Sequence, residues 1–218
     1  MNVLIIPDLH VPYHHPDAFD FLADVARQHD YDRIVCIGDE IDAHAFGRWP
    51  PHPDLDSPGK ELESVVKQLK PLYKLFPQVD VVASNHTYRP WKQAYEAGLP
   101  TSVLRSIREV LEAPKKWRWH ERLVINKVLY FHGDGYGGAH PAYKAMLDNR
   151  MSVVIGHVHT KAAVYWSATR FDRIFGMSTG CLIDANKLAF SYAKFNANRP
   201  MLGCAQIVDN VPMVVPLR

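Results

Sequence analysis

The chain has 218 residues, 47% of them hydrophobic and 22% charged, and its formal net charge at pH 7 is +2. This apolar content excludes global disorder, and the length predicts a single domain over residues 1–218. No apolar run approaches the ~18 residues of a membrane-spanning helix, so no membrane partner is expected. Three scattered cysteines make no disulfide framework, and the first residues lack the features of a signal peptide. Together these features predict a cytoplasmic protein.

Short apolar runs alternate with amphipathic stretches along most of the chain. The runs predict strands at residues 3–6, 34–37, 79–83, 123–125, 128–131 and 152–155. Apolar side chains at helical spacing predict helices after Pro16 and over residues 60–76, 101–112 and 142–149, with Thr101 as an N-cap. From residue 163 onward the pattern is that of strands, with a last hairpin at residues 209–210. This order predicts a layered α/β domain with mixed sheets.

Three connecting segments have unusual compositions. Residues 43–59 contain four prolines and predict a long loop, which either borders a functional site or is a surface excursion. Residues 115–120 interleave basic and aromatic side chains, as nucleic-acid contacts do, but a loop with both tryptophans packed inward is favoured. Residues 133–138 are rich in glycine without the Lys-Ser/Thr of a nucleotide-binding loop, and are expected to let backbone approach a site closely.

Five of the predicted strands are followed at once by Asp, Asn or His side chains. The residues are Asp8 and His10, Asp39 and Asp42, Asn85 and His86, His132, and His157 and His159. In open α/β sheets, functional groups collect at the carboxyl ends of the strands, so these side chains are expected to lie close together. The chain is also rich in histidine, with 12 in all, which favours metal or acid–base chemistry.

The ligand types predict the kind of metal site. Carboxylate, imidazole and carboxamide without thiolate favour Mn²⁺, with Fe, Zn²⁺ or Ni²⁺ as alternatives, over a zinc held by cysteines. Seven candidate ligands exceed the four of one tetrahedral site, so two divalent ions that share a carboxylate fit better. Two-metal sites serve displacement at phosphorus. Two such ions with Asp8, Asp39 and a bridging hydroxide leave a net positive charge, which suits an anionic phosphate ester.

The order of these motifs resembles that of the calcineurin-like metallophosphoesterase family. The resemblance rests on Asp8-x-His10, Gly38-Asp39-x-x-Asp42, Asn85-His86, His132 and Gly156-His157-x-His159. It implies an α/β fold that is a four-layer αββα sandwich of two mixed β-sheets flanked by helices. It also implies a hydrolase that cleaves a phosphate ester through a hydroxide activated by two metals.

The resemblance further implies a role for each residue. The first metal would bind Asp8, His10, Asp39 and His159, and the second would bind Asp39, Asn85, His132 and His157. His86 would face the substrate and protonate the leaving alcohol, and Asp42 would orient it by a hydrogen bond. Residues 43–59 and 133–138 directly follow ligand-bearing strand ends, so both are expected to border the cleft and to govern substrate choice.

The sequence departs from the family at two motifs. Ser84 precedes Asn85 where the family has glycine, and Thr87 follows His86 where it has an acid. The protein phosphatases of the family carry Arg-Gly after the residue that corresponds to Asp42, and this chain has Ala43-His44. The missing arginine favours a phosphodiester, of a nucleotide or a nucleic acid, over a phosphomonoester or a phosphoprotein.

Two further residues are candidate substrate contacts, and one rival function stays open. Arg89 and His44 are close in sequence to these motifs and are candidates for binding the phosphate, with plain surface residues as the alternative. The rival is a non-catalytic interaction scaffold on the same fold. Such a scaffold is expected to have lost ligands or His86, all of which this sequence retains.

Overall fold

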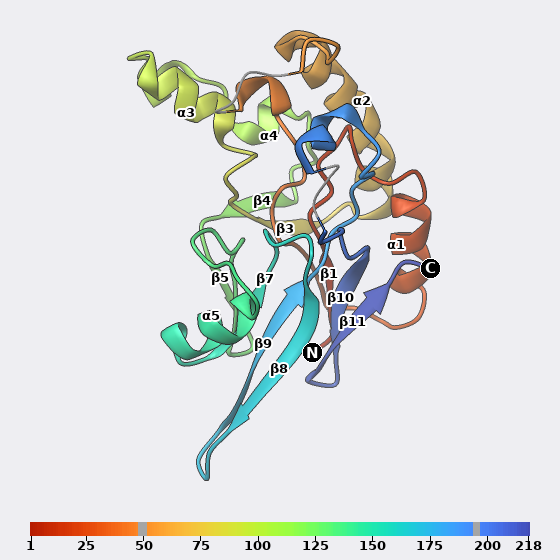
Figure 1. Cartoon of the computed structure of the whole chain (residues 1–218), viewed down its shortest axis with the longest axis vertical. Coiled ribbons are helices and arrows are strands. Elements are labelled where there is room, and N and C mark those ends of the chain that lie inside the picture. The colour runs from red at the N-terminus through yellow and green to blue at the C-terminus, as the bar shows by residue number, and fades with distance from the viewer. Residues whose placement is uncertain (48–51, 194–196) are drawn as a thin grey trace.

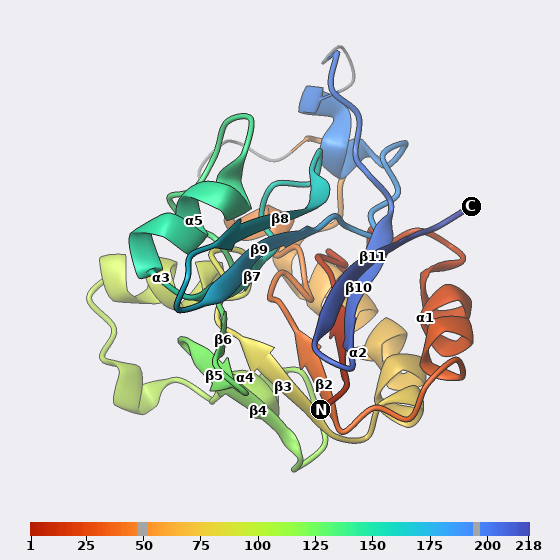
Figure 2. The same cartoon turned by 90° about the horizontal axis from the view of Figure 1, so that it is seen from below.

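The computed structural model describes residues 1–47, 52–193 and 197–218. In these residues the strands form two sheets that pack face to face, with helices on the outer faces (Figures 1 and 2). The predicted αββα sandwich of two mixed sheets is therefore confirmed. No helix of the described residues is long and apolar enough to span a bilayer.

The first sheet has the order β11-β10-β1-β2-β3-β4. In it β1 to β4 run parallel, and β10 is antiparallel to both of its neighbours, β1 and β11. Its strands are β1 (Val3–Ile6), β2 (Arg33–Cys36), β3 (Val79–Val82), β4 (Trp117–His120), β10 (Gly203–Val208) and β11 (Val211–Pro216). All four residues of β1 are buried, because one face meets helices and the other meets the second sheet. A strand that is covered on both faces has a continuous apolar sequence, as β1 has.

The second sheet has the order β5-β6-β7-β9-β8. Its strands are β5 (Leu123–Ile125), β6 (Val128–Tyr130), β7 (Ser152–Ile155), β8 (Ala162–Ala168) and β9 (Arg173–Thr179). The central strands β6, β7 and β9 are parallel, and β5 and β8 are antiparallel edges. The hairpin of β8 and β9 projects from the body of the molecule (Figure 1).

Helices cover both outer faces. α1 (Ala18–Ala26) and α2 (Pro58–Leu75) pack Leu22 and Leu69 on the first sheet, and α5 (Pro141–Asn149) packs Met146 on the second. The smaller helices are α3 (Arg89–Glu96), α4 (Ile107–Val110), η1 (His44–Phe46), η2 (Thr101–Val103) and η3 (Leu188–Ala193). The apolar core between the sheets joins β1, β2 and β3 to β6, β7 and β9, and so fixes the strand ends of both sheets relative to one another.

Several local predictions differ from the structure. Residues 188–193, in the stretch predicted to contain strands alone, form η3. Residues 101–112 form η2 and α4 in place of one helix, because Ser106 begins a new helix with a capping box. Its Oγ accepts the N–H of Glu109 at 3.3 Å, and the Glu109 carboxylate accepts the N–H of Ser106 at 2.9 Å. The predicted loop at residues 43–59 contains η1 and ends earlier, since α2 begins at Pro58; residues 48–51, with Pro50 and Pro51, lie outside the described residues.

The prediction of a loop at residues 115–120 is also wrong. Residues 117–120 form β4, which pairs with β3 and extends the first sheet. The inward packing of both tryptophans is confirmed: Trp117 is buried and its Nε1–H donates to the carbonyl of Phe76 at 2.8 Å, and Trp119 packs on the same core. The apolar surface of these rings favours an added strand over a loop.

Candidate metal centre and active site

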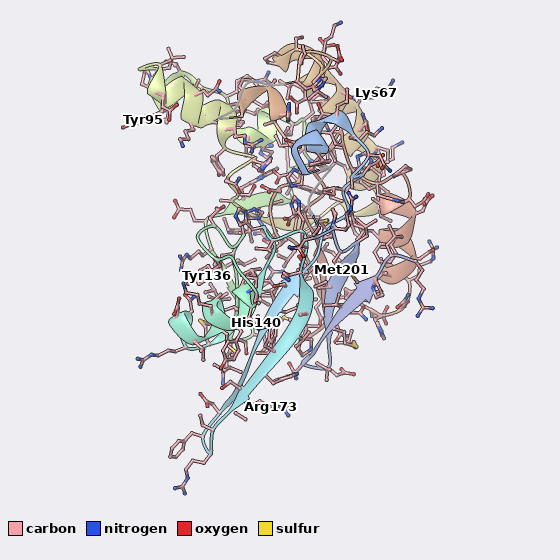
Figure 3. All side chains as sticks on the ribbon, viewed as in Figure 1. Lys67, Tyr95, Tyr136, His140, Arg173 and Met201 are labelled. Atoms are coloured by element: carbon pink, nitrogen blue, oxygen red, sulfur yellow. The ribbon has the colours of Figure 1, made fainter. Side chains whose placement is uncertain are left out.

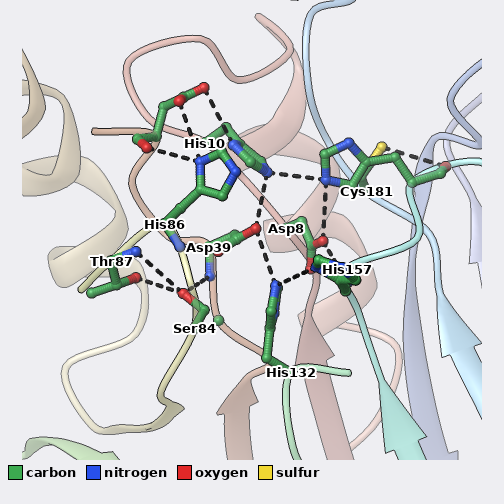
Figure 4. Close-up of polar contacts among 12 residues, drawn as sticks. Asp8, His10, Asp39, Ser84, His86, Thr87, His132, His157 and Cys181 are labelled. Atoms are coloured by element: carbon green, nitrogen blue, oxygen red, sulfur yellow. Dashed lines mark hydrogen bonds and ion pairs between the residues drawn. The ribbon is translucent and has the colours of Figure 1, made fainter. Parts of the chain in front are cut away.

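Backbone hydrogen bonds join the strand ends of the two sheets. The N–H groups of Leu9 and His10 donate to the carbonyl of Asp39 at 3.0 and 2.8 Å. Gly156 donates to the carbonyl of His132 at 2.9 Å, and Leu182, beyond β9, donates to the carbonyl of Asp8 at 2.8 Å. These bonds bring residues that are far apart in sequence to one end of the sandwich (Figure 4).

The backbone at this end adopts unusual conformations. His10, Asp39 and His157 have φ angles of 52°, 47° and 66°, in the left-handed region that side chains with a Cβ disfavour. Gly156 is required for a different reason, because a Cβ there would overlap Oδ1 of Asp8. Strained residues of this kind cluster at functional sites, where the surrounding structure holds them in place.

A first cluster comprises Asp8, His10, Asp39 and His159, each of which offers one ligand atom within 4.8 Å of the others. Nε2 of His159 lies 3.2 Å from Oδ2 of Asp8 and 3.0 Å from Nε2 of His10. Nε2 of His10 lies 3.3 Å from Oδ2 of Asp39. All but His159 are buried.

A second cluster shares Asp39 with the first and adds His132 and His157. Nε2 of His132 lies 3.1 Å from the same Oδ2 of Asp39, and 3.3 Å from Nδ1 of His157. Nδ1–H of His132 donates to the carbonyl of Ile37 at 2.9 Å, which turns Nε2 toward Asp39. One carboxylate oxygen therefore lies between the two groups of imidazoles (Figure 4).

The two clusters fit divalent cations. Oδ1 of Asp8 is buried and finds no hydrogen-bond partner among the described residues. Pairs of imidazole nitrogens face one another at 3.0 and 3.3 Å, where both members of a pair cannot donate a proton at once. A cation between them would take up these lone pairs together with the carboxylate oxygens. The donors are carboxylate and imidazole without thiolate, a set that suits Mn²⁺, Fe or Zn²⁺.

The acids and the imidazoles shift each other's pKa values. Burial would raise the pKa of Asp39, but the charges of His132 and His86 and a hydrogen bond from His10 hold it well below its usual range. Burial would lower the pKa of His10 and of His132, but their acidic neighbours raise both to about 10. The carboxylates thus attract positive charge into this end of the sandwich, as protons or as metal ions.

A third cluster contains Asp42, His86 and His10. Nδ1–H of His86 donates to the backbone carbonyl of Asp42 at 2.8 Å, while the nearer carboxylate oxygen is 3.3 Å away. Oδ2 of Asp42 lies 3.3 Å from Nδ1 of His10. Asp42 therefore contacts both histidines, and it orients His86 mainly through its main chain.

The remaining candidates occupy different positions. Arg89 donates to the carbonyl of Asp42 at 3.1 Å and to Nε2 of His86 at 2.8 Å, so its guanidinium lies next to the third cluster. Asn85 is exposed on the same turn as His86. His44 lies in η1, where its ring packs edge-on against Tyr13, and it belongs to none of the three clusters.

Ser84 and Thr87, the two departures from the family pattern, form a hydrogen-bond network next to Asp39. Ser84 accepts the backbone N–H of Asp39 on its Oγ at 2.8 Å and bonds to Thr87 at 2.8 Å. Thr87 in turn donates to the buried carboxylate of Glu40 at 2.8 Å, which also accepts Nε1–H of Trp119 at 2.9 Å. Glu40 was not predicted as a site residue, because its only signal in the sequence is its place beside Asp39 at a strand end.

A cavity of about 390 Å³ opens beside the clusters. Asp39, His86, His157 and His159 line it, and so do Tyr136 and Gly137 of the glycine-rich segment, which therefore borders the cleft as predicted. Part of its wall comes from residues 198–200, which the sequence analysis did not connect with the site. Its volume falls in the range of small-molecule sites.

No family model and no curated protein matches the chain. Among solved structures, a single mutant of Vps29 from Entamoeba histolytica is 15% identical with a TM-score of 0.43, covering 100% of both chains. YfcE, a phosphoesterase from E. coli, is 13% identical with a TM-score of 0.46, over 99% of this chain and 93% of that one. The Pseudomonas putida nuclease MPE is 14% identical with a TM-score of 0.41, over 99% and 87%. At such low similarity, function has to be argued from this chain's own side chains.

Proposed function

We propose that this chain is a divalent-metal-dependent phosphoesterase of the calcineurin-like kind, with a phosphodiester of a nucleotide or nucleic acid as its substrate. The observation that carries the proposal is the pair of clusters that meet at Oδ2 of Asp39. The first metal would be held by Asp8, His10, Asp39 and His159, and the second by Asp39, His132 and His157. Asn85, on the exposed turn after β3, is the further ligand that the family resemblance implies. When bound, two such ions polarise phosphoryl oxygens and lower the pKa of bound water.

His86 is suited to protonate the leaving oxygen. Its Nδ1–H is held by the carbonyl of Asp42, so Nε2 is the nitrogen that remains for the substrate. Burial lowers the pKa of His86, which makes its protonated form a better proton donor. His86 also lines the cavity, next to the histidines of the clusters.

Arg89 is suited to bind the phosphate before the reaction. Its guanidinium donates to Nε2 of His86, the same atom that must reach the leaving group. An incoming phosphate offers this guanidinium a stronger, charged acceptor than a neutral imidazole. When the phosphate takes over this guanidinium hydrogen bond, Nε2 is freed to take up a proton from solvent, which it then gives to the leaving oxygen.

A diester is favoured over a monoester because the phosphatase-type arginine after Asp42 is replaced by Ala43. The rival, a scaffold without catalysis, has no need of the metal-binding residues and His86, all of which this chain retains.

Metal reconstitution tests the proposal. Metal-free protein would be loaded with Mn²⁺, Fe²⁺, Zn²⁺ or Ni²⁺, and metal content would be measured beside hydrolysis of bis-p-nitrophenyl phosphate and p-nitrophenyl phosphate. Two ions per chain and faster cleavage of the diester are expected. Asp148→Asn, a matched change at an exposed site on α5, should behave like the wild type. Bound metal without hydrolysis of either ester would favour the scaffold, and absence of bound metal would contradict both the site and the activity.

A further inference from the structure

The cavity beside the clusters has an outer wall that the proposed chemistry does not use. This wall includes Tyr136 from the glycine-rich segment after β6, and Arg199 from the segment between η3 and β10. Tyr136 and Met201, which are labelled in Figure 3, mark these two segments. The imidazoles and Asp39 line the same cavity, so a substrate that fills it contacts both the reacting groups and these residues.

Hydrogen bonds fix the Arg199 segment to the site. The N–H of Met201 donates to the carbonyl of His159 at 2.7 Å, and the carbonyl of Met201 accepts the N–H of Cys181 at 3.1 Å. Gly180 permits this approach, because a Cβ there would lie 2.6 Å from the Met201 carbonyl. Arg199 therefore lies two residues before Met201, whose main chain bonds to the proposed metal ligand His159. It reaches this position although it follows His159 by 40 residues in the sequence.

Arg199 supplies positive charge to this wall. It is the one lysine or arginine among the described residues that line the cavity, and Asp39 is the one carboxylate there. Asp39 is already surrounded by imidazoles, and Arg199 takes part in none of the ion pairs between described residues. The exposed guanidinium is thus available to an anion, and phosphate is the anion that its planar set of donors fits best.

Tyr136 supplies an aromatic side chain to the same cavity. One side of its ring packs on Phe131, with ring centroids 5.6 Å apart, and the residue is half-buried. Its hydroxyl accepts Nδ2–H of Asn149 at 3.4 Å, a contact that holds the side chain in place at the edge of the cavity. An aromatic ring beside a cation is the combination that binds single-stranded nucleic acid, through base stacking and phosphate contacts.

We infer that the cavity takes a single-stranded oligonucleotide, with Arg199 on the phosphate next to the scissile one and Tyr136 stacked on the base between them. This inference rests on the proposed function, because the scissile phosphate is placed at the metal clusters. Arg199 is a substrate-binding residue under this inference, and it leaves the reacting groups unchanged. Its loss should therefore raise KM for substrates with a second phosphate and leave kcat nearly unaltered.

A pair of chromogenic esters separates the two contacts. The p-nitrophenyl ester of thymidine 5′-phosphate contains one phosphate, and its 3′-phosphorylated counterpart contains a second one. For Arg199→Ala we expect KM to rise about tenfold or more for the 3′-phosphorylated ester, the effect of losing a hydrogen bond between charged groups. The other ester should change less than about twofold, and Arg199→Lys should restore part of the loss. Tyr136→Ala should weaken both esters about equally, by tenfold or more, because both carry the base.

Matched variants and a binding experiment complete the test. Arg170→Ala, at the exposed turn between β8 and β9, and Tyr95→Ala, exposed on α3, should behave like the wild type. Titration calorimetry of the metal-loaded protein with thymidine 3′,5′-bisphosphate and with thymidine 5′-phosphate measures the same contact without turnover. Equal losses on both ligands for Arg199→Ala, or no loss on either, would overturn the inference. Hydrolysis of neither ester by the wild type, with selective loss of bisphosphate affinity, would overturn the proposed activity and retain the Arg199 contact.

Discussion

Two buried carboxylates, one in β3 and one just beyond the neighbouring strand β2, have opposite surroundings. Asp80, in β3, accepts hydrogen bonds on Oδ2 from the guanidinium of Arg33 and on Oδ1 from Nε2 of His120, the latter at 2.9 Å. Arg118 of β4 adds a second guanidinium 3.7 Å away. Asp39, just beyond β2, contacts the imidazoles of His10 and His132 at 3.3 and 3.1 Å, and none of the ion pairs between described residues joins it to a lysine or arginine.

The difference decides what each carboxylate can do. The pKa of Asp80 is below its usual range although burial would raise it, because hydrogen bonds from Arg33 and His120 stabilise the charged form. Arginine stays charged at any ordinary pH, so the negative charge of Asp80 is neutralised without a metal ion. The imidazoles around Asp39 are charged only when protonated, so this carboxylate can exchange protons for cations. A buried acid among histidines is therefore a candidate site, and one among arginines is a structural link.

Removing the carboxylate of Asp39, which both clusters share, should have the largest effect. Asp39→Asn should reduce bound metal from two ions to at most one and bring hydrolysis down to the level of the metal-free protein, because one residue serves both clusters. Elemental analysis and assay with bis-p-nitrophenyl phosphate check this. Asp148→Asn is the control, and full metal content with full activity in Asp39→Asn would show that the two clusters do not bind metal.

Removing the proposed acid should have the next largest effect. His86→Ala is expected to keep both metals and the fold, and to lose ~10²–10⁴-fold in kcat, the usual contribution of positioned acid catalysis. The loss should be smaller for esters of nitrophenol than for esters of alkyl alcohols, since a good leaving group needs less protonation. Rates with both ester types, measured beside metal content, test the role. Equal losses for the two types, or a lost metal, would instead make His86 a phosphate binder or a ligand.

Changing Asp42 should be milder. Asp42→Asn retains the backbone carbonyl that accepts Nδ1–H of His86 at 2.8 Å, and it removes the negative charge that faces His86, His10 and Arg89. Loss of such an outer partner typically costs ~10–100-fold in affinity or activity. Kinetics with poor leaving groups and metal titration separate an effect on His86 from one on His10. A loss as large as that of His86→Ala would mean that the carboxylate, rather than the main chain, orients the acid.

The arginine-paired carboxylate should affect stability alone. Asp80→Asn leaves Arg33 and Arg118 beside each other without a counter-charge, and hydrogen bonds to charged groups contribute about 1.5–3 kcal/mol each. Since Arg33 is partly exposed, water will offset part of the loss, and the free energy of unfolding should fall by about 1–2 kcal/mol. Urea unfolding measures the fall, and metal content and activity below the midpoint should equal those of the wild type. A loss of bound metal in this variant would remove the distinction between the two carboxylates.

The smallest expected effect is on the pH dependence of the free energy of unfolding. Because the pKa of Asp80 is lowered in the folded protein, its charge contributes stability above the unfolded value of about 3.9, and that contribution is lost as the pH falls through the folded value. The stability difference between wild type and Asp80→Asn should therefore be largest at pH 7 and shrink in acid. Urea unfolding of metal-free protein at pH 7 and near pH 3 gives both differences. A difference that grows in acid would mean that Asp80 is not held in its charged form.

The sequence by itself determined the fold class and the residues that meet at the site. Apolar runs closed by Pro7, Gly38 and Gly156 define strand ends, and chemistry-bearing side chains follow each of them. Both signals are local, because a strand that is buried on both faces has a continuous apolar sequence. Local signals failed where neighbours in space decided the outcome. Residues 117–120 are a strand because β3 offers a free edge and the core accepts Trp117.

Only the tertiary structure decided how the site residues face one another. The carbonyl of Ile37 turns Nε2 of His132 toward Asp39, and the predicted hydrogen bond from Asp42 to His86 is made by the backbone carbonyl. Arg199 carries no signal of its own in the sequence, and it reaches the cavity because Met201 bonds to His159. Such contacts join segments whose separation along the chain carries no periodicity, so they exist only once the two sheets have packed.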